Sequence, residues 1–253
     1  MAEPLPTSLP QVARIVERRD ETPHVRTFVF DLSLAGQPGQ FVMAWLPGVD
    51  EKPFSLVRDK PVTLAVARVG PFTEAVFGLD VGDQIWLRGP LGTPFRLPAS
   101  GPEASGQTAG DLLLVGGGYG IAPMRFLAGQ ALEAGWGVDV VIGARTDADV
   151  FYLDRFAASG ARVHVTTEDG SLGEQGFATD AVHRLLDQRA YREWYACGPE
   201  PMLEAVARLG LSRRVPVQLS YERYMRCGLG VCGSCSRQGW LVCRDGPVRR
   251  VTP

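Results

Sequence analysis

The stretch LLLVGGGYGIAP, residues 112–123, joins a continuous apolar run to a glycine-rich loop and then to a proline. Such a run is typical of a buried strand, and proline is favoured in the first turn of a helix. Glycines let the backbone approach a phosphate, and the amino end of a helix favours an anion. The stretch predicts a strand, loop and helix that bind a nucleotide. Because the usual Gly-x-Gly-x-x-Gly fingerprint is absent, a plain tight turn is the alternative interpretation.

Downstream of this unit, apolar runs alternate with helical stretches. This alternation is typical of a parallel sheet covered by helices. The expected strands are 112–115, 138–142, 163–166, 193–196 and 217–219, and the expected helices are 122–134, 151–158, 178–186 and 200–209.

The first part of the chain has a different pattern of short apolar runs, each bounded by Gly, Pro or Asp. Six such strands at this spacing predict a small antiparallel β-barrel. The expected strands are 12–16, 25–32, 41–46, 54–57, 63–69 and 84–88.

The length of 253 residues fits two compact domains and a small appendage. We predict a barrel over 1–97, a linker over 98–110 that is rich in Gly, Ser and Ala, and a nucleotide-binding α/β domain over 111–219. A small cysteine-bearing subdomain is expected over 220–253. Since that segment has no apolar periodicity, we expect it to need an inorganic group to hold its shape.

Composition excludes several classes of function. With 26 basic and 28 acidic side chains the net charge is −2, which argues against a nucleic-acid partner. No apolar run reaches the roughly 20 residues of a membrane span, and the first residues do not form a secretory signal, so we expect a cytoplasmic protein. The absence of a Gly-x-Ser-x-Gly or His-Glu-x-x-His motif argues against hydrolysis.

Four of the five cysteines lie close together near the C-terminus, in the pattern Cys-x4-Cys-x2-Cys-x7-Cys. The first three cysteines, with their x4 and x2 spacings, match the plant-type iron–sulfur loop. Reduced thiols at such spacing predict a ligand cluster, and a structural zinc site is the alternative. The expected metal ligands are Cys227, Cys232, Cys235 and Cys243.

The fifth thiol, Cys197, follows the expected strand 193–196. Ligands of open parallel sheets bind at the carboxyl ends of the strands, so this thiol is a candidate for chemistry. A free cysteine also packs well as a small buried hydrophobe, which is the alternative interpretation.

Two motifs in the barrel half combine groups that suit a flavin nucleotide. Lys52, Phe54 and Ser55 bring a cation, an aromatic ring and a hydroxyl to one strand. Gly70 and Thr73 stand at the start of an expected short helix over 73–79, whose amino end would favour phosphate oxygens. Each motif taken alone is equally compatible with an ordinary exposed turn.

With these motifs the chain resembles the ferredoxin–NADP reductase superfamily, and within it the electron-transfer subunits of NAD-dependent (class 1B) dihydroorotate dehydrogenase. The most specific part is ERYMRCGLGVCGSC at 222–235, followed by CRDGPV at 243–248. PGQFV at 38–42 and GPLG at 89–92 are similar to the family's barrel segments.

The resemblance implies FAD, NAD and a [2Fe–2S] cluster as cofactors. It also implies a catalytic partner subunit that contains FMN, oxidises dihydroorotate to orotate for pyrimidine biosynthesis, and forms a heterotetramer with two copies of each chain. Cys197 is the residue expected to act at the nicotinamide. The expected cofactor-binding residues are Lys52, Pro53, Phe54, Ser55, Val66, Ala67, Arg68, Gly70, Phe72 and Thr73 for the flavin, and Gly117, Gly118, Gly120, Pro123, Gly198, Pro199 and Met202 for NAD.

Three features leave alternatives open. Lys52 stands where the family usually has an arginine, which replaces a bidentate fork by a point charge. The seven-residue gap before Cys243 is also similar to gamma subunits of sulfhydrogenases and to the B subunit of anaerobic sulfite reductase. Arg145 follows the second parallel strand and could meet the 2′-phosphate of NADP. A zinc-stapled regulatory module that binds a nucleotide is the non-enzymatic alternative.

Overall fold

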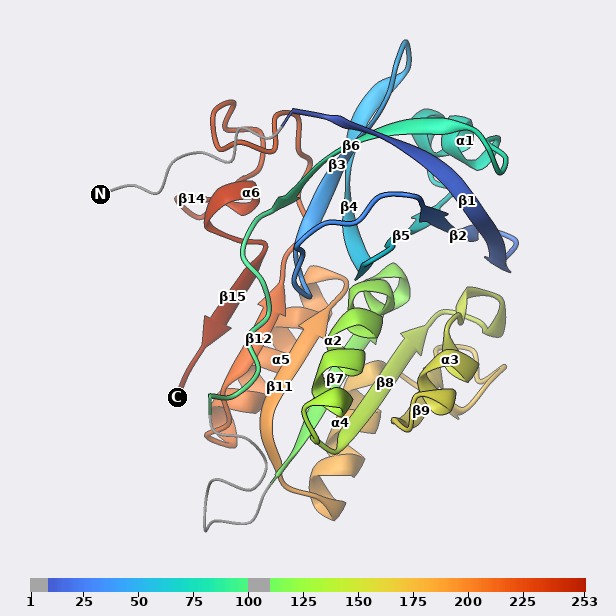
Figure 1. Ribbon diagram of the computed structural model, residues 1–253. Helices are drawn as coiled ribbons and strands as arrows, with labels where there is room; N and C mark the ends of the chain where they lie inside the picture. Colours follow the sequence, from blue (N-terminus) through green and yellow to red (C-terminus); the bar gives the residue numbers. More distant parts are fainter. Residues whose placement is uncertain (1–8, 100–109) are drawn as a thin grey trace. The chain divides into compact units, whose positions relative to one another are not determined.

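The computed structural model describes residues 9–99 and 110–253. These form two compact units, coloured along the chain in Figure 1. The barrel unit combines the chain up to Pro94 with Glu222–Val248, and the sheet unit combines Phe95–Tyr221 with Arg249–Pro253. Most of the expected linker, 98–110, lies outside the described residues. The four-part domain division stays a prediction.

The barrel unit contains the expected closed barrel of six strands, in the order β1-β2-β5-β4-β3-β6. Every neighbouring pair is antiparallel. The helix α1 (Pro71–Phe77) follows β5. The strands are β1 (Gln11–Thr22), β2 (Val25–Phe30), β3 (Phe41–Leu46), β4 (Asp50–Asp59), β5 (Val62–Ala67) and β6 (Gln84–Leu91).

Burial along the strands shows what covers each face of the barrel. In β1, the buried Ala13 and Ile15 alternate with the exposed Val12 and Val16, as expected for a strand with one solvated face. In β3, by contrast, the four residues Phe41–Ala44 are all buried. Both faces of β3 are therefore covered.

The cysteine-bearing segment covers the second face of β3. Met225, Val242 and the thiols Cys235 and Cys243 share one hydrophobic cluster with barrel residues that include Met43. The segment therefore has a core, which the barrel strands complete. Its elements, which the sequence pattern did not indicate, are β13 (Ser236–Arg237), β14 (Trp240–Leu241) and α6 (Val242–Asp245).

The sheet unit has the strand order β10-β9-β8-β7-β11-β12-β15 (Figure 1). The pairs from β10 to β12 are parallel, which confirms the expected α/β architecture. Strands β10 and β15 at the two edges are additions to the expected set. The strands are β7 (Asp111–Gly117), β8 (Val138–Ala144), β9 (Arg162–Thr167), β10 (Glu174–Gln175), β11 (Tyr191–Cys197), β12 (Val217–Ser220) and β15 (Val248–Val251).

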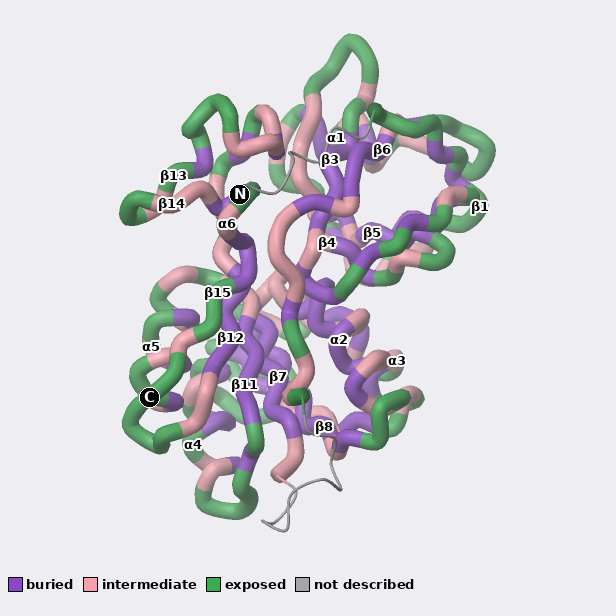
Figure 2. Tube along the Cα trace, turned by 60° about the vertical axis from the view of Figure 1, so that its left-hand side comes forward, coloured by how far each residue is buried: buried purple, intermediate pink, exposed green. Residues whose placement is uncertain are grey.

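Helices cover both faces of this sheet, so its central strands β7 and β8 are buried almost throughout (Figure 2). Figure 1 shows α2 and α3 on one face and α4 and α5 on the other. The 3-10 turns are η1 (Gly118–Gly120) and η2 (Asp147–Asp149). The α-helices are α2 (Ile121–Glu133), α3 (Leu153–Ala158), α4 (Ala178–Gln188) and α5 (Glu200–Ser212).

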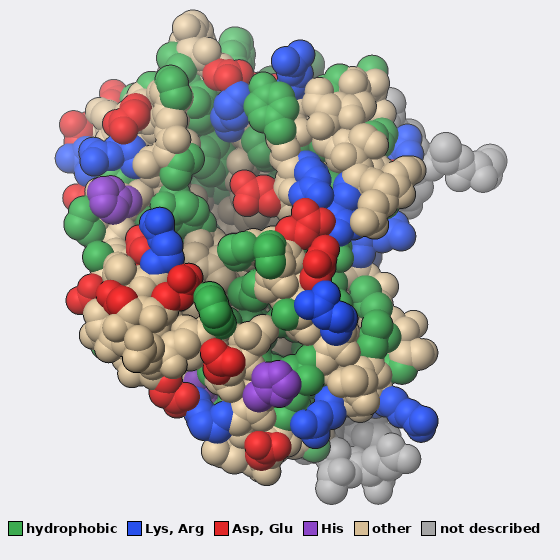
Figure 3. Space-filling view, turned by 180° about the vertical axis from the view of Figure 1, so that it is seen from behind, with side chains coloured by type: hydrophobic (Ala, Val, Ile, Leu, Met, Phe, Trp, Pro, Cys, Tyr) green, Lys and Arg blue, Asp and Glu red, His purple; other side chains and the backbone are tan. Residues whose placement is uncertain are grey.

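The surface has no dominant charge. Figure 3 shows acidic and basic side chains interspersed over one face, in line with the net charge of −2. Among the described residues, no helix combines the length and apolar character needed to cross a membrane.

A buried carboxylate joins neighbouring strands of the sheet. Asp139 on β8 is fully buried and accepts hydrogen bonds from Arg162 on β9, at 3.1 and 2.7 Å. The ring of His164 lies 2.7 Å from the same carboxylate. Burial by itself would raise the pKa of Asp139, but the bonds from His164 and Arg162 outweigh burial and lower that pKa well below its usual range.

We predict that Asp139→Asn lowers the free energy of unfolding at pH 7 by about 3 kcal/mol, because Arg162 then loses a buried partner. This loss lies at the low end of the about 3–5 kcal/mol that breaking a buried ion pair typically costs, because the Arg162 side chain is 37% exposed. The pKa is lower in the folded than in the unfolded state, so the stabilisation is present above pH ~4 and is lost as the pH falls further.

Urea unfolding at pH 7 and pH 3 measures both effects. The variant should lose less stability than the wild type between the two pH values. Asn at the exposed Asp187 is the matched control and should change neither value. If the free energy of unfolding depends on pH equally in the wild type and in the Asp139 variant, the lowered pKa of Asp139 is contradicted.

Candidate functional site

The carboxyl edge of the sheet holds the first part of the site. From β7 the chain proceeds outward to β8 and β9, and then returns to β11 on the other side of β7. The strand order therefore reverses between β7 and β11, and ligands of such sheets bind at this switch point. There Cys197, the last residue of β11, pairs with Gly116 of β7. The two nicotinamide motifs expected from the sequence meet at this edge.

Close packing of the two loops explains their glycines. A Cβ atom on Gly120 would lie 2.7 Å from the nitrogen of Gly198 and closer still to the carbonyl of Cys197. A Cβ on Gly117 would lie 2.7 Å from Sδ of Met202 and 2.9 Å from Cδ of Pro199. These contacts leave no room for a side chain. The structure therefore brings these expected residues together.

Two helices begin at the same edge, which gives it the character of an anion site. Helix α2 begins at Ile121, with Pro123 buried in its first turn, and α5 begins at Glu200 directly after Pro199. Both helices are 13 residues long. The dipoles of these helices favour a pyrophosphate at their amino ends. Gly118, with φ of 52°, and the half-exposed Tyr119 lie in the turn between β7 and α2.

The expected cation of the barrel motif, Lys52, has protein partners. Its ammonium bonds the carboxylate of Asp50 on the same strand, and it lies 5.2 Å from the ring centre of Tyr224. The hydrogen bond from Lys52 holds the pKa of Asp50 below its usual value. A phosphate bound here would compete with Asp50 for Lys52. Pro53, Phe54 and Ser55 follow on β4 and are partly exposed.

The remaining flavin residues gather beside this motif. The rings of Phe54 and Phe72 lie 6.1 Å apart, which joins β4 to helix α1. The hydroxyl of Thr73 accepts hydrogen bonds from the N–H groups of Val69 and Gly70, at 2.9 and 3.0 Å, and fixes the turn that precedes the helix.

On the neighbouring strand β5, Val66 is buried and Ala67 is partly buried. Arg68 follows the strand, lies 3.6 Å from the carboxylate of Glu74, and is 40% exposed. Its guanidinium is the most accessible cation of the expected set.

The cysteine loop arranges its thiols as two pairs. The Sγ atoms of Cys235 and Cys243 lie 3.3 Å apart. Cys227 lies close enough to Cys232 to lower the pKa of its thiol. Among the described residues, no three metal-ligating side chains converge on one point. A [2Fe–2S] cluster takes two protein ligands on each iron, whereas a single zinc ion takes four ligands around one point. The paired arrangement of the thiols therefore fits the cluster better than it fits zinc.

The loop backbone also faces the thiols. The N–H groups of Leu229 and Gly230 donate to Sγ of Cys227 and Cys243, at 3.4 and 3.2 Å. The N–H of Cys243 donates to Sγ of Cys235 at 3.4 Å. Gly230 has φ of 76°, a left-handed conformation that glycine adopts without strain. Inward N–H groups stabilise sulfur that carries negative charge, so the donor set fits the cluster.

The thiols differ in acidity. Hydrogen bonds from Ser234 and then from Cys227 lower the pKa of the exposed Cys232 to about 6. Burial raises the pKa of Cys243 to about 12, and its contact with Cys235 acts in the same direction. A thiol loses its proton when it coordinates a metal, so Cys243 would become a thiolate only when the cluster is bound.

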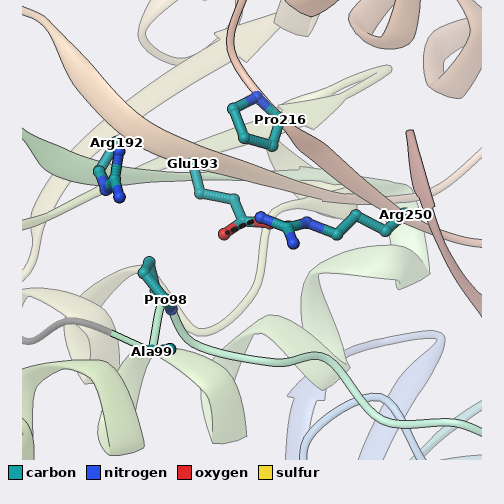
Figure 4. A pocket seen from close by; sticks show the side chains of 6 residues that line it. All are labelled: Pro98, Ala99, Arg192, Glu193, Pro216 and Arg250. Atoms are coloured by element: carbon teal, nitrogen blue, oxygen red, sulfur yellow. Dashed lines mark hydrogen bonds and ion pairs between the residues drawn. The ribbon is translucent and has the colours of Figure 1, made fainter. Parts of the chain in front are cut away.

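A cavity of about 240 Å³ lies elsewhere in the sheet unit (Figure 4). It is lined by Arg192, Glu193 and Arg250, with two prolines and Ala99. Arg192, Glu193 and Pro216 lie at the amino ends of β11 and β12, opposite the carboxyl edge that holds the expected nucleotide-binding motifs. The Glu193 carboxylate already accepts hydrogen bonds from Arg250 at 2.8 Å and from Gln218 at 2.9 Å. None of the residues expected to bind FAD or NAD lines this cavity.

One residue beside the cysteine loop has no local sequence signal. Arg88 on β6 is buried, and its Nη2 donates to the carbonyl oxygen of Cys227 at 2.7 Å. The two residues are 139 positions apart in the chain. Only an alignment with relatives could have paired them.

Comparison with known protein families finds two matches. Residues 114–208 match the oxidoreductase NAD-binding domain. Residues 222–251 match the iron–sulfur cluster binding domain of dihydroorotate dehydrogenase B. The two matched segments contain the sheet-edge motifs and all four clustered cysteines.

Relatives are similar over nearly the whole chain. A protein of Methanocaldococcus jannaschii is 40% identical over 94% of this chain and 89% of its own length. A protein of Thermococcus kodakarensis is 42% identical over 94% of this chain and 95% of its own length. Both are described as probable electron transfer subunits of dihydroorotate dehydrogenase B (NAD(+)).

Solved structures agree with the fold. The structure of an NADH-dependent reduced ferredoxin–NADP oxidoreductase, studied for flavin-based electron bifurcation, has a TM-score of 0.81 and 31% identity, over 94% of this chain and 87% of that one. An Amycolatopsis cytochrome P450 reductase has a TM-score of 0.67 and 29% identity, over 81% of this chain and 67% of that one.

Proposed function

Because the chain belongs to the family of electron transfer subunits of dihydroorotate dehydrogenase B, we propose that it passes electrons between a catalytic dehydrogenase subunit and NAD. The observation that carries this proposal is the loop of four paired thiols within the segment that matches the family's iron–sulfur domain. When bound, FAD, NAD and the [2Fe–2S] cluster supply hydride exchange, conversion of electron pairs to single electrons, and one-electron transfer.

At the sheet edge, this chain's residues bind and orient the dinucleotide. The amino ends of α2 and α5 hold its pyrophosphate through N–H groups. The glycine backbone between β7 and α2 allows close approach, and Cys197 at the end of β11 positions the nicotinamide ring. In the barrel, the motif from Lys52 to Ser55 and the turn fixed by Thr73 hold the flavin nucleotide.

In the cysteine loop, Cys227, Cys232, Cys235 and Cys243 hold the cluster. The packing of Met225 and Val242 with barrel residues keeps the loop in place, and the inward N–H groups stabilise the charge of its sulfur ligands. The exposed Cys232 and Val231 leave one side of the loop open to solvent. This is the side from which a partner subunit would exchange electrons.

The relatives' names as electron transfer subunits imply a catalytic partner. We propose that the partner contains FMN, oxidises dihydroorotate to orotate, and forms a heterotetramer with two copies of this chain. The direction of transfer is then from dihydroorotate to NAD⁺.

The test is dihydroorotate-dependent reduction of NAD⁺ by the complex that this chain forms in its native cell extract, prepared without oxygen. Formation of NADH and orotate in equal amounts supports the proposal. A brown complex that NADH reduces but that does not respond to dihydroorotate would reject the substrate and retain the cofactors. A colourless protein that contains zinc would reject the electron-transfer role.

A role for Cys197 at the nicotinamide makes a separate prediction. Cys197→Ala should slow reduction of the bound flavin by NADH by about tenfold, since misplacement of reacting groups by about 1 Å can cost up to 100-fold. Stopped-flow absorbance of the flavin band measures the rate. The visible spectrum of the oxidised protein should be unchanged, and an unchanged rate would exclude the role.

A further inference from the structure

Arg88 is a buried arginine that connects the barrel with the cysteine loop. The residue is only 8% exposed. Its Nη2 donates to the carbonyl oxygen of Cys227 at 2.7 Å and to Oε1 of Glu51 at 3.1 Å. Hydrogen bonds from a charged donor are stronger than neutral ones. Arg88 therefore fixes the backbone of the first thiol of the loop.

The strand register places Arg88 in a row with Met43 and Pro53. Arg88 on β6 lies opposite Met43 on β3, and Met43 lies opposite Pro53 on β4. Residues directly opposite on antiparallel strands share a face of the sheet. Met43 packs with Cys235 and Cys243, so this face is the one that the cysteine segment covers. The same row contains Pro53 of the flavin motif.

Part of the Arg88 guanidinium has no protein partner. Its Nη1 is buried and has no hydrogen-bond partner among residues 9–99 and 110–253. Buried donors are nearly always paired with a protein group, a water or a bound ligand. The only carboxylate that pairs with Arg88 in the described structure is that of Glu51, whose side chain is 26% exposed and thus remains partly solvated. The positive charge of Arg88 is therefore incompletely balanced by the protein.

On the basis of the function proposed above, we propose that Arg88 is a positioning residue for the iron–sulfur cluster that also favours its reduced state. One-electron reduction adds one negative charge to the cluster and consumes one electron from the reductant. A buried positive charge beside the loop stabilises that added charge, because screening is weak away from water. Cluster potentials respond to such charges and to hydrogen bonds around the sulfur ligands. Glu51 opposes the effect.

The test is an anaerobic redox titration of the purified complex with dithionite, in which electron paramagnetic resonance follows the reduced cluster. In Arg88→Met, the ratio of reduced to oxidised cluster at a fixed potential should fall by about tenfold, which is a midpoint about 59 mV more negative for a one-electron couple. Arg88→Lys keeps the charge and should restore most of the ratio. Glu51→Gln removes the opposing charge and should shift the ratio in the other direction.

Arg18→Met is the matched control. Arg18 also donates to a backbone carbonyl, that of Leu79 at 3.2 Å, and pairs with a carboxylate, that of Asp80 at 2.8 Å, but it lies on β1. Its midpoint should equal that of the wild type.

Three results would overturn the proposal: an unchanged midpoint in Arg88→Met with full iron content, equal shifts in the Met and Lys variants, or an unchanged midpoint in Glu51→Gln. The Glu51 variant keeps the test decisive if Arg88→Met does not retain its cluster. Wild-type protein without iron and acid-labile sulfide would instead reject the proposed function itself.

Discussion

Replacement of Cys243 by serine is expected to abolish the iron–sulfur cluster while the barrel still binds flavin. Cys243 is 3% exposed and forms a close pair with Cys235, so no other thiol can take its place at that iron. Loss of groups that merely support a metal ligand typically costs 10–100-fold in affinity. Loss of the ligand should therefore lower cluster affinity by at least about 100-fold. Iron and acid-labile sulfide per chain, measured with flavin content, test this expectation.

The matched control is Cys197→Ser, which makes the same chemical change in the sheet unit. It should retain full iron and sulfide. Wild-type cluster content in the Cys243 variant would contradict the ligand assignment. Loss of flavin together with the cluster would show that the variant is misfolded, and Cys232→Ser, at an exposed position, would then provide the test.

The second large effect is expected for Gly120→Ala at the sheet edge. The added methyl group would overlap the backbone of Cys197 and Gly198, which cannot move as a side-chain tip can. Overpacking of this kind typically costs 1–3 kcal/mol, so we expect a loss of about 2–3 kcal/mol in the free energy of unfolding. Because the two loops form the proposed nicotinamide site, NADH-dependent reduction of the flavin should fall by more than about tenfold.

Gly129→Ala, in the helix that follows Gly120, is the control and should have the opposite effect on stability. Gly129 lies inside α2, and its added Cβ would lie 3.9 Å from Nη1 of Arg125, which is an ordinary van der Waals contact. Alanine in a helix interior should stabilise the protein by roughly 0.5–1 kcal/mol. Urea unfolding of both variants separates the contributions of packing and of helix propensity to the free energy of unfolding. A Gly120 variant as stable as the wild type would show that the loops can separate without cost.

Strand and helix positions were largely predictable because they depend on local periodicity. The run 112–115 lies within β7, and the expected strand 41–46 coincides with β3. The two-residue strand β10 and the four-residue strand β15 are too short to have such a signal, and each is defined by its pairing in the sheet. The cysteine segment was expected to lack a core of its own, and its apolar side chains pack in a cluster shared with barrel residues, including two of β3. Its dependence on an inorganic group stays a prediction.

For the site, the donor types and their order could be predicted from the amino-acid sequence: four thiols at iron–sulfur spacing, two glycine-bearing loops after apolar strands, and a cation near an aromatic ring. These depend on neighbours a few residues away. The packing of distant segments, by contrast, places Lys52 over the ring of Tyr224, Gly120 against Cys197, and Arg88 within hydrogen-bonding distance of the carbonyl of Cys227. Such contacts could not be predicted because they join residues from different strands and loops, whose positions depend on the packing of the whole unit.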